Sequence, residues 1–254
     1  MSRVDEMTGV EVRNPSDGGG KPQRLEVEEI RAQKGSLYPE GTLIETKSYY
    51  LSARGEKVLH GPDIQFYENG KTWRQADYRH GKRDGLLVEY SPYSGEKVRE
   101  EHYRDDRREG LTVEWHFKDR KASECTYHND RIVGKRLYWN GINGALQVEE
   151  IYDDDRYLAE LTAWHDNGQK AKHGWFKGVW PKVMGGPQLA GKRDGTWTYW
   201  DTEGKIVAEG QWKVGKPWEG ICIVPRASGS LFVGEKGTYH NGKLVGGVMR
   251  ELEF

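Results

Sequence analysis

The pentapeptide GKRDG occurs at 81–85, and the same five residues, GKRDG, return at 191–195. A catalytic loop is needed once, because an active site is assembled from unlike parts, whereas a structural unit recurs as often as the architecture requires. The duplication therefore indicates a repeat protein. We interpret GKRDG as the link between one β-hairpin and the next, since glycine supplies the positive φ that tight turns need.

Further glycines extend this pattern along the chain. The residues that open successive units are Gly61, Gly85, Gly110, Gly134, Gly195, Gly220 and Gly246. Neighbours in this series are about 24 residues apart except after Gly134, where Ala159 stands in the place of a missing glycine. The stretch from Ala159 to Gly195 is one unit plus about 12 extra residues. The sequence therefore predicts about eight units with one insertion.

Aromatic residues hold fixed places within each unit. Five residues after the opening position come Phe66, Tyr90, Trp115, Trp139, Trp164 and Trp200. A second aromatic follows the mid-unit turn, at Tyr78, Tyr103, Phe176 and Trp212. Apolar residues at every second position, as in Leu86, Val88 and Tyr90, favour strands over helices. Each ring is then expected to be covered by the neighbouring unit, which makes stability collective.

The predicted fold class is all-β, an elongated twisted solenoid of about eight stacked antiparallel β-hairpins with a period of about 24 residues. Turn positions are assigned to Gly70, Gly81, Gly85, Gly168, Gly191, Gly195, Gly204 and Gly215. Residues 1–40 are expected to form a flexible tail and a cap, and residues 41–254 the repeat domain, with an insertion at about 179–190. Whether residues 25–45 form a helix or a capping strand stays open.

This pattern resembles the MORN-repeat family, and more closely its bacterial variant of the toxin–antitoxin type. The resemblance is carried by HGPDIQFYENGKTWRQADYRHGKRDG (60–85), YRDDRREGLTVEW (103–115), WHDNGQKAKHGWF (164–176), GKRDGTWTYWDTEGKIVAEGQWKVGKPWEG (191–220) and YHNGKLVGG (239–247). It implies a twisted sheet of β-hairpins that acts as an interaction module without catalytic residues, and for the bacterial variant the neutralisation of a partner toxin. The chain departs from the family at Ala159, at Arg120 in place of a mid-turn glycine, and at the insertion after Phe176.

Charge and composition exclude several classes. The net charge is -1, so the basic excess typical of nucleic-acid binding is missing. Two cysteines, Cys125 and Cys222, are too few for a disulfide framework and fit a reducing compartment. No apolar run has the length of a leader or of a transmembrane segment. We therefore expect a cytoplasmic protein that does not bind nucleic acid.

Motifs for catalysis, metals and cofactors are absent from the sequence. It contains no HExxH, no CxxC, no Gly-x-Ser-x-Gly elbow and no phosphate-binding loop. Glu89 and Glu114 occupy equivalent places in two units, which favours a solvated face over an acid–base pair. We predict no enzyme activity, no catalytic or metal-binding residue and no cofactor.

Two functional classes remain open. The favoured one is a protein-interaction scaffold, with an antitoxin or immunity protein that occludes a toxin or effector as one form of it. The other is a carbohydrate- or cell-wall-binding hairpin module, and contact with a membrane surface or a glycan stays open with it. The insertion contains Trp180, Lys182 and Met184, an aromatic, a charged and a flexible apolar side chain that are typical of an interface. We predict that these three residues bind a protein partner, and the alternative that the insertion covers the end of the neighbouring hairpin stays open.

Overall fold

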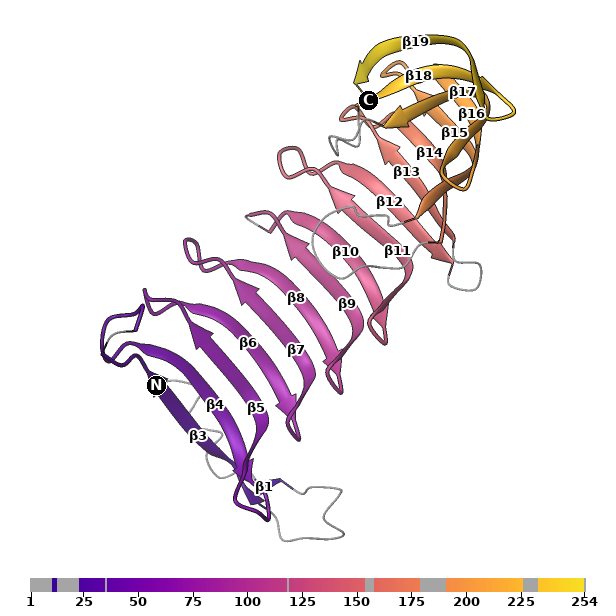
Figure 1. Ribbon diagram of the computed structural model, residues 1–254. Coiled ribbons are helices and arrows are strands. Elements are labelled where there is room, and N and C mark those ends of the chain that lie inside the picture. The colour runs from indigo at the N-terminus through magenta and orange to yellow at the C-terminus, as the bar shows by residue number, and fades with distance from the viewer. Residues whose placement is uncertain are drawn as a thin grey trace. The chain divides into compact units, whose positions relative to one another are not determined.

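The computed structural model describes residues 11–12, 23–34, 36–117, 119–153, 158–178, 191–225 and 233–253 (Figure 1). These residues form β-strands, turns and loops, and they contain no helix. The all-β fold class is therefore confirmed. No helix of the described residues is long and apolar enough to span a membrane. The insertion, with Trp180, Lys182 and Met184, lies outside the described residues.

The strands of the described residues are numbered in the order in which they follow one another along the chain. They are β1 (Glu11–Val12), β2 (Gln23–Arg24), β3 (Glu26–Arg31), β4 (Leu43–Leu51), β5 (Lys57–Phe66), β6 (Thr72–Arg79), β7 (Lys82–Tyr90), β8 (Lys97–Arg104), β9 (Arg107–Trp115), β10 (Lys121–His128), β11 (Arg131–Trp139), β12 (Leu146–Asp153), β13 (Leu158–Trp164), β14 (Lys170–Lys177), β15 (Lys192–Trp200), β16 (Ile206–Lys213), β17 (Lys216–Pro225), β18 (Val233–His240) and β19 (Lys243–Glu253).

The chain divides into two compact units. The first comprises Met1–Arg120 and Tyr127–Asp130, and the second comprises Lys121–Thr126 and Arg131–Phe254. In the first unit every strand from β3 to β9 pairs antiparallel with the next one. In the second unit the strands from β11 to β19 do the same. Each hairpin thus joins the next through a ladder of backbone hydrogen bonds.

The segment 25–45, open between helix and strand, contains β3 and the beginning of β4. Strand β3 pairs with β4 from Glu26 opposite Tyr49 to Arg31 opposite Leu43. This segment therefore supplies the first long strand of the meander, inside the range expected to hold the tail and cap.

Two-residue turns close hairpins at one end of the strands. His80-Gly81 joins β6 to β7 with φ of 50° and 83°, and Asp105-Asp106 joins β8 to β9 with φ of 49° and 70°. Positive φ at both central residues is the type I′ turn, whose twist matches that of the strands. Only Gly81 of the first GKRDG lies in such a turn, because residues 82–85 already belong to β7.

Two of the opening glycines lie at β-bulges. Gly85 and Gly195, both assigned to turns from the sequence, lie inside β7 and β15 with φ of 127° and 73°, where the ladder with the preceding strand shifts its register. A glycine with positive φ at a register shift defines a bulge. A Cβ on Gly85 would approach the Cβ of Asp77 to 3.0 Å. Both its backbone conformation and its close neighbour therefore demand glycine.

The other glycines assigned to turns lie outside strands. Positive φ values of 78° to 84° occur at Gly70, Gly81, Gly168, Gly204 and Gly215. Gly191 lies at a bend directly before β15.

Register explains why a small residue opens each unit. Glycine faces the second aromatic of the unit in the pairs Gly61–Tyr78, Gly85–Tyr103, Gly134–Tyr152, Gly195–Trp212 and Gly220–Tyr239. Ala159 faces Phe176 in the same way and is fully buried. The absence of a large side chain leaves room for the opposite ring. Ala159 therefore keeps the pairing of the opening glycines with the second aromatic, but it lacks their positive φ, and the ladder with β12 has no register shift there.

The arginine of GKRDG covers the same ring. The Arg83 guanidinium lies 4.1 Å from the centre of the Tyr103 ring, and that of Arg193 lies 4.9 Å from the centre of a Trp212 ring. A guanidinium over an aromatic face is attracted by the ring quadrupole. The pentapeptide recurs because its arginine and its last glycine together seat one aromatic residue.

The first aromatics of the units end their strands. Phe66, Tyr90, Trp115, Trp139, Trp164 and Trp200 are each the last residue of a strand, and all are half-buried. They flank the longer loops instead of filling the centre of a core.

The largest fully buried side chain is Trp197, which the sequence pattern did not single out. Its indole packs edge-on against Phe176, with ring centres 5.0 Å apart, and its Nε1–H donates to the backbone oxygen of Trp175 over 3.1 Å. A Cβ on Gly174 would come within 2.2 Å of the indole, so glycine is required beneath the ring. The core of the second unit is built around this contact and includes Leu161, Tyr199, Trp212, Cys222 and Ile223.

Candidate functional site

The strands of the first unit end on two edges of different character (Figure 1). The long-loop edge carries the loops 32–42, 67–71, 91–96 and 116–120. The short-turn edge carries the loop 52–56 and the turns 80–81, 105–106 and 129–130. We treat the two edges separately because different kinds of side chain gather on them.

Large apolar side chains are exposed along the long-loop edge. Leu37 is 97% exposed, Tyr93 is 91% exposed and Phe117 is 50% exposed, each on a different loop. Trp73, in β6 directly after the loop 67–71, is 42% exposed. We call Leu37, Trp73, Tyr93 and Phe117 the loop-edge apolar set.

Hydrogen bonds hold two of these loops side by side. The Asn69 side-chain amide donates to the Pro92 backbone oxygen over 3.0 Å, and Lys71 Nζ donates to the backbone oxygen of Tyr93. The Tyr67 hydroxyl donates to the Tyr90 backbone oxygen over 2.7 Å. The backbone that carries Tyr93 is therefore fixed by its neighbour, while the ring itself points into solvent.

A similar feature occurs in the second unit. Ile142, on the loop 140–145, is 85% exposed. The Asn140 side-chain amide donates to Asp166 Oδ1 over 3.1 Å and ties this loop to the loop 165–169. Exposed apolar side chains on braced loops are thus present in both units.

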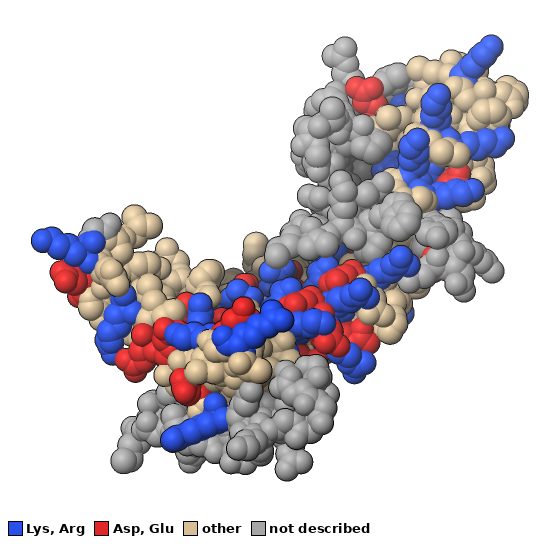
Figure 2. Space-filling model, turned by 60° about the horizontal axis from the view of Figure 1, so that its bottom comes forward, with Lys and Arg blue, Asp and Glu red and all other residues tan. Residues whose placement is uncertain are grey.

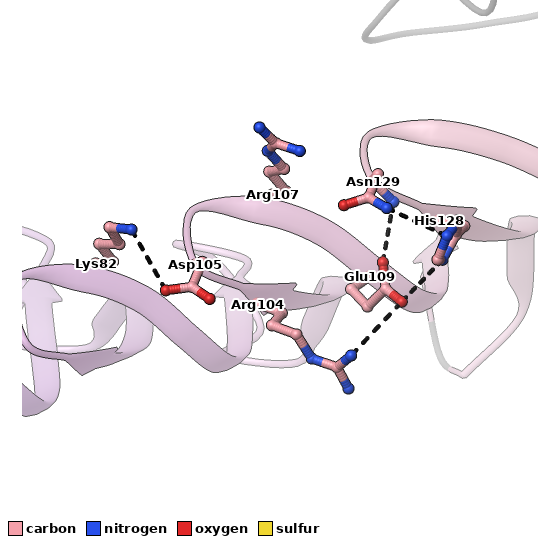
Figure 3. A pocket seen from close by; sticks show the side chains of 7 residues that line it. All are labelled: Lys82, Arg104, Asp105, Arg107, Glu109, His128 and Asn129. Carbon is pink, nitrogen blue, oxygen red and sulfur yellow. Dashed lines mark hydrogen bonds and ion pairs between the residues drawn. The ribbon is translucent and has the colours of Figure 1, made fainter. Parts of the chain in front are cut away.

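The short-turn edge of the first unit contains an open hollow of about 310 Å³ (Figure 3). Its lining is polar and charged, and consists of Lys82, Arg104, Asp105, Arg107, Glu109, His128 and Asn129. Lys82 Nζ lies 3.4 Å from Asp105 Oδ1, and Arg104 Nη1 lies 4.0 Å from Glu109 Oε1. Arg107 points away from these pairs.

One part of this lining is structural. Glu109 accepts from the backbone N–H of Asn129 over 2.9 Å and contacts His128 Nδ1 over 3.0 Å. The Asn129 N–H bond, together with His128, holds the pKa of the Glu109 carboxyl below its ordinary value. Glu219 makes the same contacts with His240 and Asn241 in the second unit, over 2.9 and 3.2 Å. A contact that recurs in both units serves the architecture.

Buried carboxylates also recur. Glu101 is 4% exposed and accepts from the Tyr103 hydroxyl over 2.8 Å, and Glu150 is 1% exposed and accepts from the Tyr152 hydroxyl over 2.7 Å. In both cases the tyrosine is the second aromatic of its unit, facing an opening glycine. The buried carboxylates of Glu101 and Glu150 therefore hold the tyrosine rings in place by accepting from their hydroxyl groups.

Glu89 and Glu114, the equivalent pair in the sequence, are bridged by a cation. Arg99 Nη2 lies 2.9 Å from Glu114 Oε1, and Arg99 Nη1 lies 3.8 Å from Glu89 Oε2. Arg99 Nε also lies 3.6 Å from Glu101 Oε1, so one guanidinium group pairs with three carboxylates.

Asp63 is the carboxylate whose ionisation the fold opposes most clearly. It is 8% exposed, and burial, followed by the charge of Glu45, raises its pKa from 3.8 to about 6. A folded pKa above the unfolded value stabilises the fold at pH below about 4, and this contribution is lost as the pH rises through 6. At neutral pH the charged Asp63 therefore costs stability.

We expect Asp63→Asn to raise the free energy of unfolding at pH 7 by about 1–2 kcal/mol, after allowance for solvent screening. Asp63 shares a side-chain hydrogen bond with Glu45, and an asparagine amide in its place can still donate to Glu45. Urea denaturation of both proteins at pH 7 and at pH 4 measures the effect. The gain should vanish at pH 4, and an equal gain at both pH values would contradict the assignment to ionisation.

The described residues contain no group of three or more His, Cys, Asp or Glu side chains that could hold a metal ion. Both cysteines of the sequence are free and buried. No protein-family model matches the sequence, and no curated protein sequence matches it either.

Proposed function

We propose that the chain is a non-catalytic protein-interaction scaffold, a MORN-like solenoid of about eight hairpins with a period of about 24 residues. The observation that carries the proposal is the exposure of Leu37, Tyr93 and Phe117 on three loops of one edge. An apolar side chain that a loop holds in solvent adds little to the stability of the fold, whereas aromatic anchors supply much of the energy of protein interfaces.

The bracing of the loops supports this role. A side chain on a fixed loop loses less conformational entropy on binding than one on a mobile loop, and this preorganisation favours affinity. Tyrosine and tryptophan also combine a large apolar area with few rotatable bonds. Tyr93 and Trp73 therefore suit the centre of a contact with another protein.

An antitoxin or immunity protein, which occludes a toxin or effector in the cytoplasm, is the form of scaffold that we favour. Its support is the resemblance of the repeat to the bacterial MORN variants. Buried free cysteines agree with a reducing compartment.

The carbohydrate-binding alternative depends on outward-facing rings in pairs of adjacent aromatics. Tyr49 and Tyr50 are 8% and 1% exposed, and Tyr199 is 2% exposed beside a half-buried Trp200. The other two pairs, Phe66-Tyr67 and Tyr138-Trp139, are half-buried. No ring of the four pairs is exposed, which favours the protein-binding proposal.

The double variant Tyr93→Ser/Phe117→Ser should lose its protein partner. We expect isotope-labelled affinity purification from the native cell to recover that partner at least about tenfold less with the variant, since two anchors worth about 1 kcal/mol or more are removed. Both side chains are exposed, so the thermal melt should stay unchanged.

The matched control is Leu111→Ser, which removes an apolar side chain that is 43% exposed within β9. It should keep the partner. Equal recovery with the double variant and the wild type, with both folded, would rule out the long-loop edge as the binding surface.

A further inference from the structure

The short-turn edge carries pairs of like charge across its hairpins. In the first unit Arg79 lies opposite Lys82, and Arg104 lies opposite Arg107, on either side of a two-residue turn. In the second unit Lys213 lies opposite Lys216 and His240 opposite Lys243, again across two-residue turns. Basic residues thus flank short turns in both units.

Folding alone does not account for this arrangement. Like charges directly opposite one another destabilise a strand pair, and opposite charges at the same places would stabilise it. The type I′ turns depend on the conformation of their two central residues, and the flanking positions are free to carry other side chains. Because pairs of like charge recur beside these turns although they destabilise the hairpins, we take them as evidence of a role in binding.

The cations of the first unit are only partly neutralised. Lys82 Nζ lies 3.4 Å from Asp105 Oδ1. Arg104 Nη1 lies 4.0 Å from Glu109 Oε1. The Glu109 carboxylate also contacts His128 and accepts from the backbone N–H of Asn129, so it only partly neutralises Arg104. Within the part of the chain that the structure describes, Arg79 and Arg107 form no ion pair. Positive charge is therefore left over around the hollow.

We propose that the basic edge, defined as Arg79, Lys82, Arg104 and Arg107, binds an extended acidic polypeptide segment. Arg104 and Arg107 line the hollow from opposite sides and attract one carboxylate of that segment by their charge, while Arg79 and Lys82 attract a second one.

The spacing of the edge fits an extended chain. Neighbouring strands lie about 4.8 Å apart, so turns that are two strands apart follow one another at about 10 Å. A polypeptide in the extended polyproline II conformation has three residues per turn and rises about 3.1 Å per residue, so every third side chain lies on the same side and meets the next basic pair about 9 Å further on. A segment with an acidic residue at every third position therefore matches the edge.

The charges between the basic pairs favour a polypeptide over a uniform polyanion. Asp105 and Glu109 lie among the cations, and Figure 2 shows acidic residues mingled with Lys and Arg over the first unit. The whole chain has a net charge of -1. Nucleic acids and anionic membranes present dense, continuous negative charge, which such interspersed carboxylates repel.

This site is independent of the long-loop edge. The two edges lie at opposite ends of the same strands, so the acidic segment and the partner of the loop-edge apolar set can bind together. Failure of one proposal leaves the other standing.

The test is a fluorescence-anisotropy titration with a fluorescein-labelled peptide that has glutamate at every third position and glycine and serine between. The full chain should bind it, and added salt should weaken the binding. Arg104→Gln/Arg107→Gln should weaken binding by about fivefold or more, as expected for two lost charge pairs. The matched control is Lys34→Gln/Lys97→Gln, which removes equal charge at the long-loop edge and should change binding less than about twofold.

Three further probes decide the class of ligand. They are a peptide of the same composition with its glutamates in one block, a single-stranded oligothymidylate, and phosphatidylcholine vesicles with added phosphatidylserine. The proposal predicts that the spaced peptide binds tightest. It is overturned if the oligonucleotide or the vesicles bind more tightly, if the block peptide binds equally well, if the spaced peptide does not bind, or if the arginine variant binds as the wild type does while its thermal melt is unchanged.

Discussion

Replacing Trp197 with alanine is expected to lower the free energy of unfolding by about 3–5 kcal/mol. Trp197 is 1% exposed and is the largest fully buried side chain, so its removal leaves a cavity that the surrounding strands cannot refill. The substitution also leaves the backbone oxygen of Trp175 without the indole N–H that it accepts from. Urea denaturation followed by circular dichroism measures the loss.

Trp200→Ala is the matched control for this experiment. Trp200 lies in the same strand but is half-buried at its end, beside the loop 201–205. Trp200→Ala should lower the free energy of unfolding by about 1–2 kcal/mol, because less apolar area is lost and the cavity opens to solvent. Equal losses for the two variants would mean that Trp197 is not the centre of the core.

Gly174→Ala is expected to cost about 2–4 kcal/mol. The added Cβ would come within 2.2 Å of the Trp197 indole, so either the ring or strand β14 has to move. Gly174 is not among the glycines with positive φ, and the cost therefore comes from overpacking rather than from backbone strain. Thermal and urea denaturation of the single variant give its size.

A double-mutant cycle isolates this contact. Gly174→Ala combined with Trp197→Leu should cost less than the sum of the two single losses, because a smaller side chain leaves room for the new methyl group. Strictly additive losses would contradict the packing of the indole on Gly174.

The all-β hairpins could be predicted from the sequence because they depend on the spacing of glycines and aromatic residues. The spacing assigned Ala159 to an opening position, and only the structure shows that Ala159 pairs with Phe176. The role of Gly85 could not be predicted, because a glycine with positive φ suits a turn and a bulge equally well. Only the ladder, in which Gly85 faces Tyr103, distinguishes the two.

Trp197 was missed for a related reason. The spacing selects the residue five positions after the opening glycine, which is Trp200, whereas burial depends on which face of β15 meets the core. The glycine at position 174, opposite the ring, was the available signal. The segment 25–45 stayed open because its apolar residues fit neither period clearly, and pairing with β4 decides its structure.

The candidate binding surfaces could be predicted from the sequence less well than the fold. From the sequence, Tyr93 cannot be distinguished from the aromatic residues that recur in the units. Its 91% exposure depends on the hydrogen bonds that hold its loop. The basic pairs at the short turns were visible in the sequence, but only the register places Arg104 opposite Arg107. The predicted interface residues Trp180, Lys182 and Met184 stay a prediction, since they lie outside the described residues.

The central claim is that the long-loop edge of the first unit binds a protein partner. The most direct measurement is photo-crosslinking in the native cell with p-benzoylphenylalanine at position 93, compared with the same group at position 111, which is exposed within β9. We predict that position 93 yields one discrete crosslinked polypeptide that position 111 does not yield. Crosslinking to the same polypeptide from both positions, or to none from position 93, would contradict the claim.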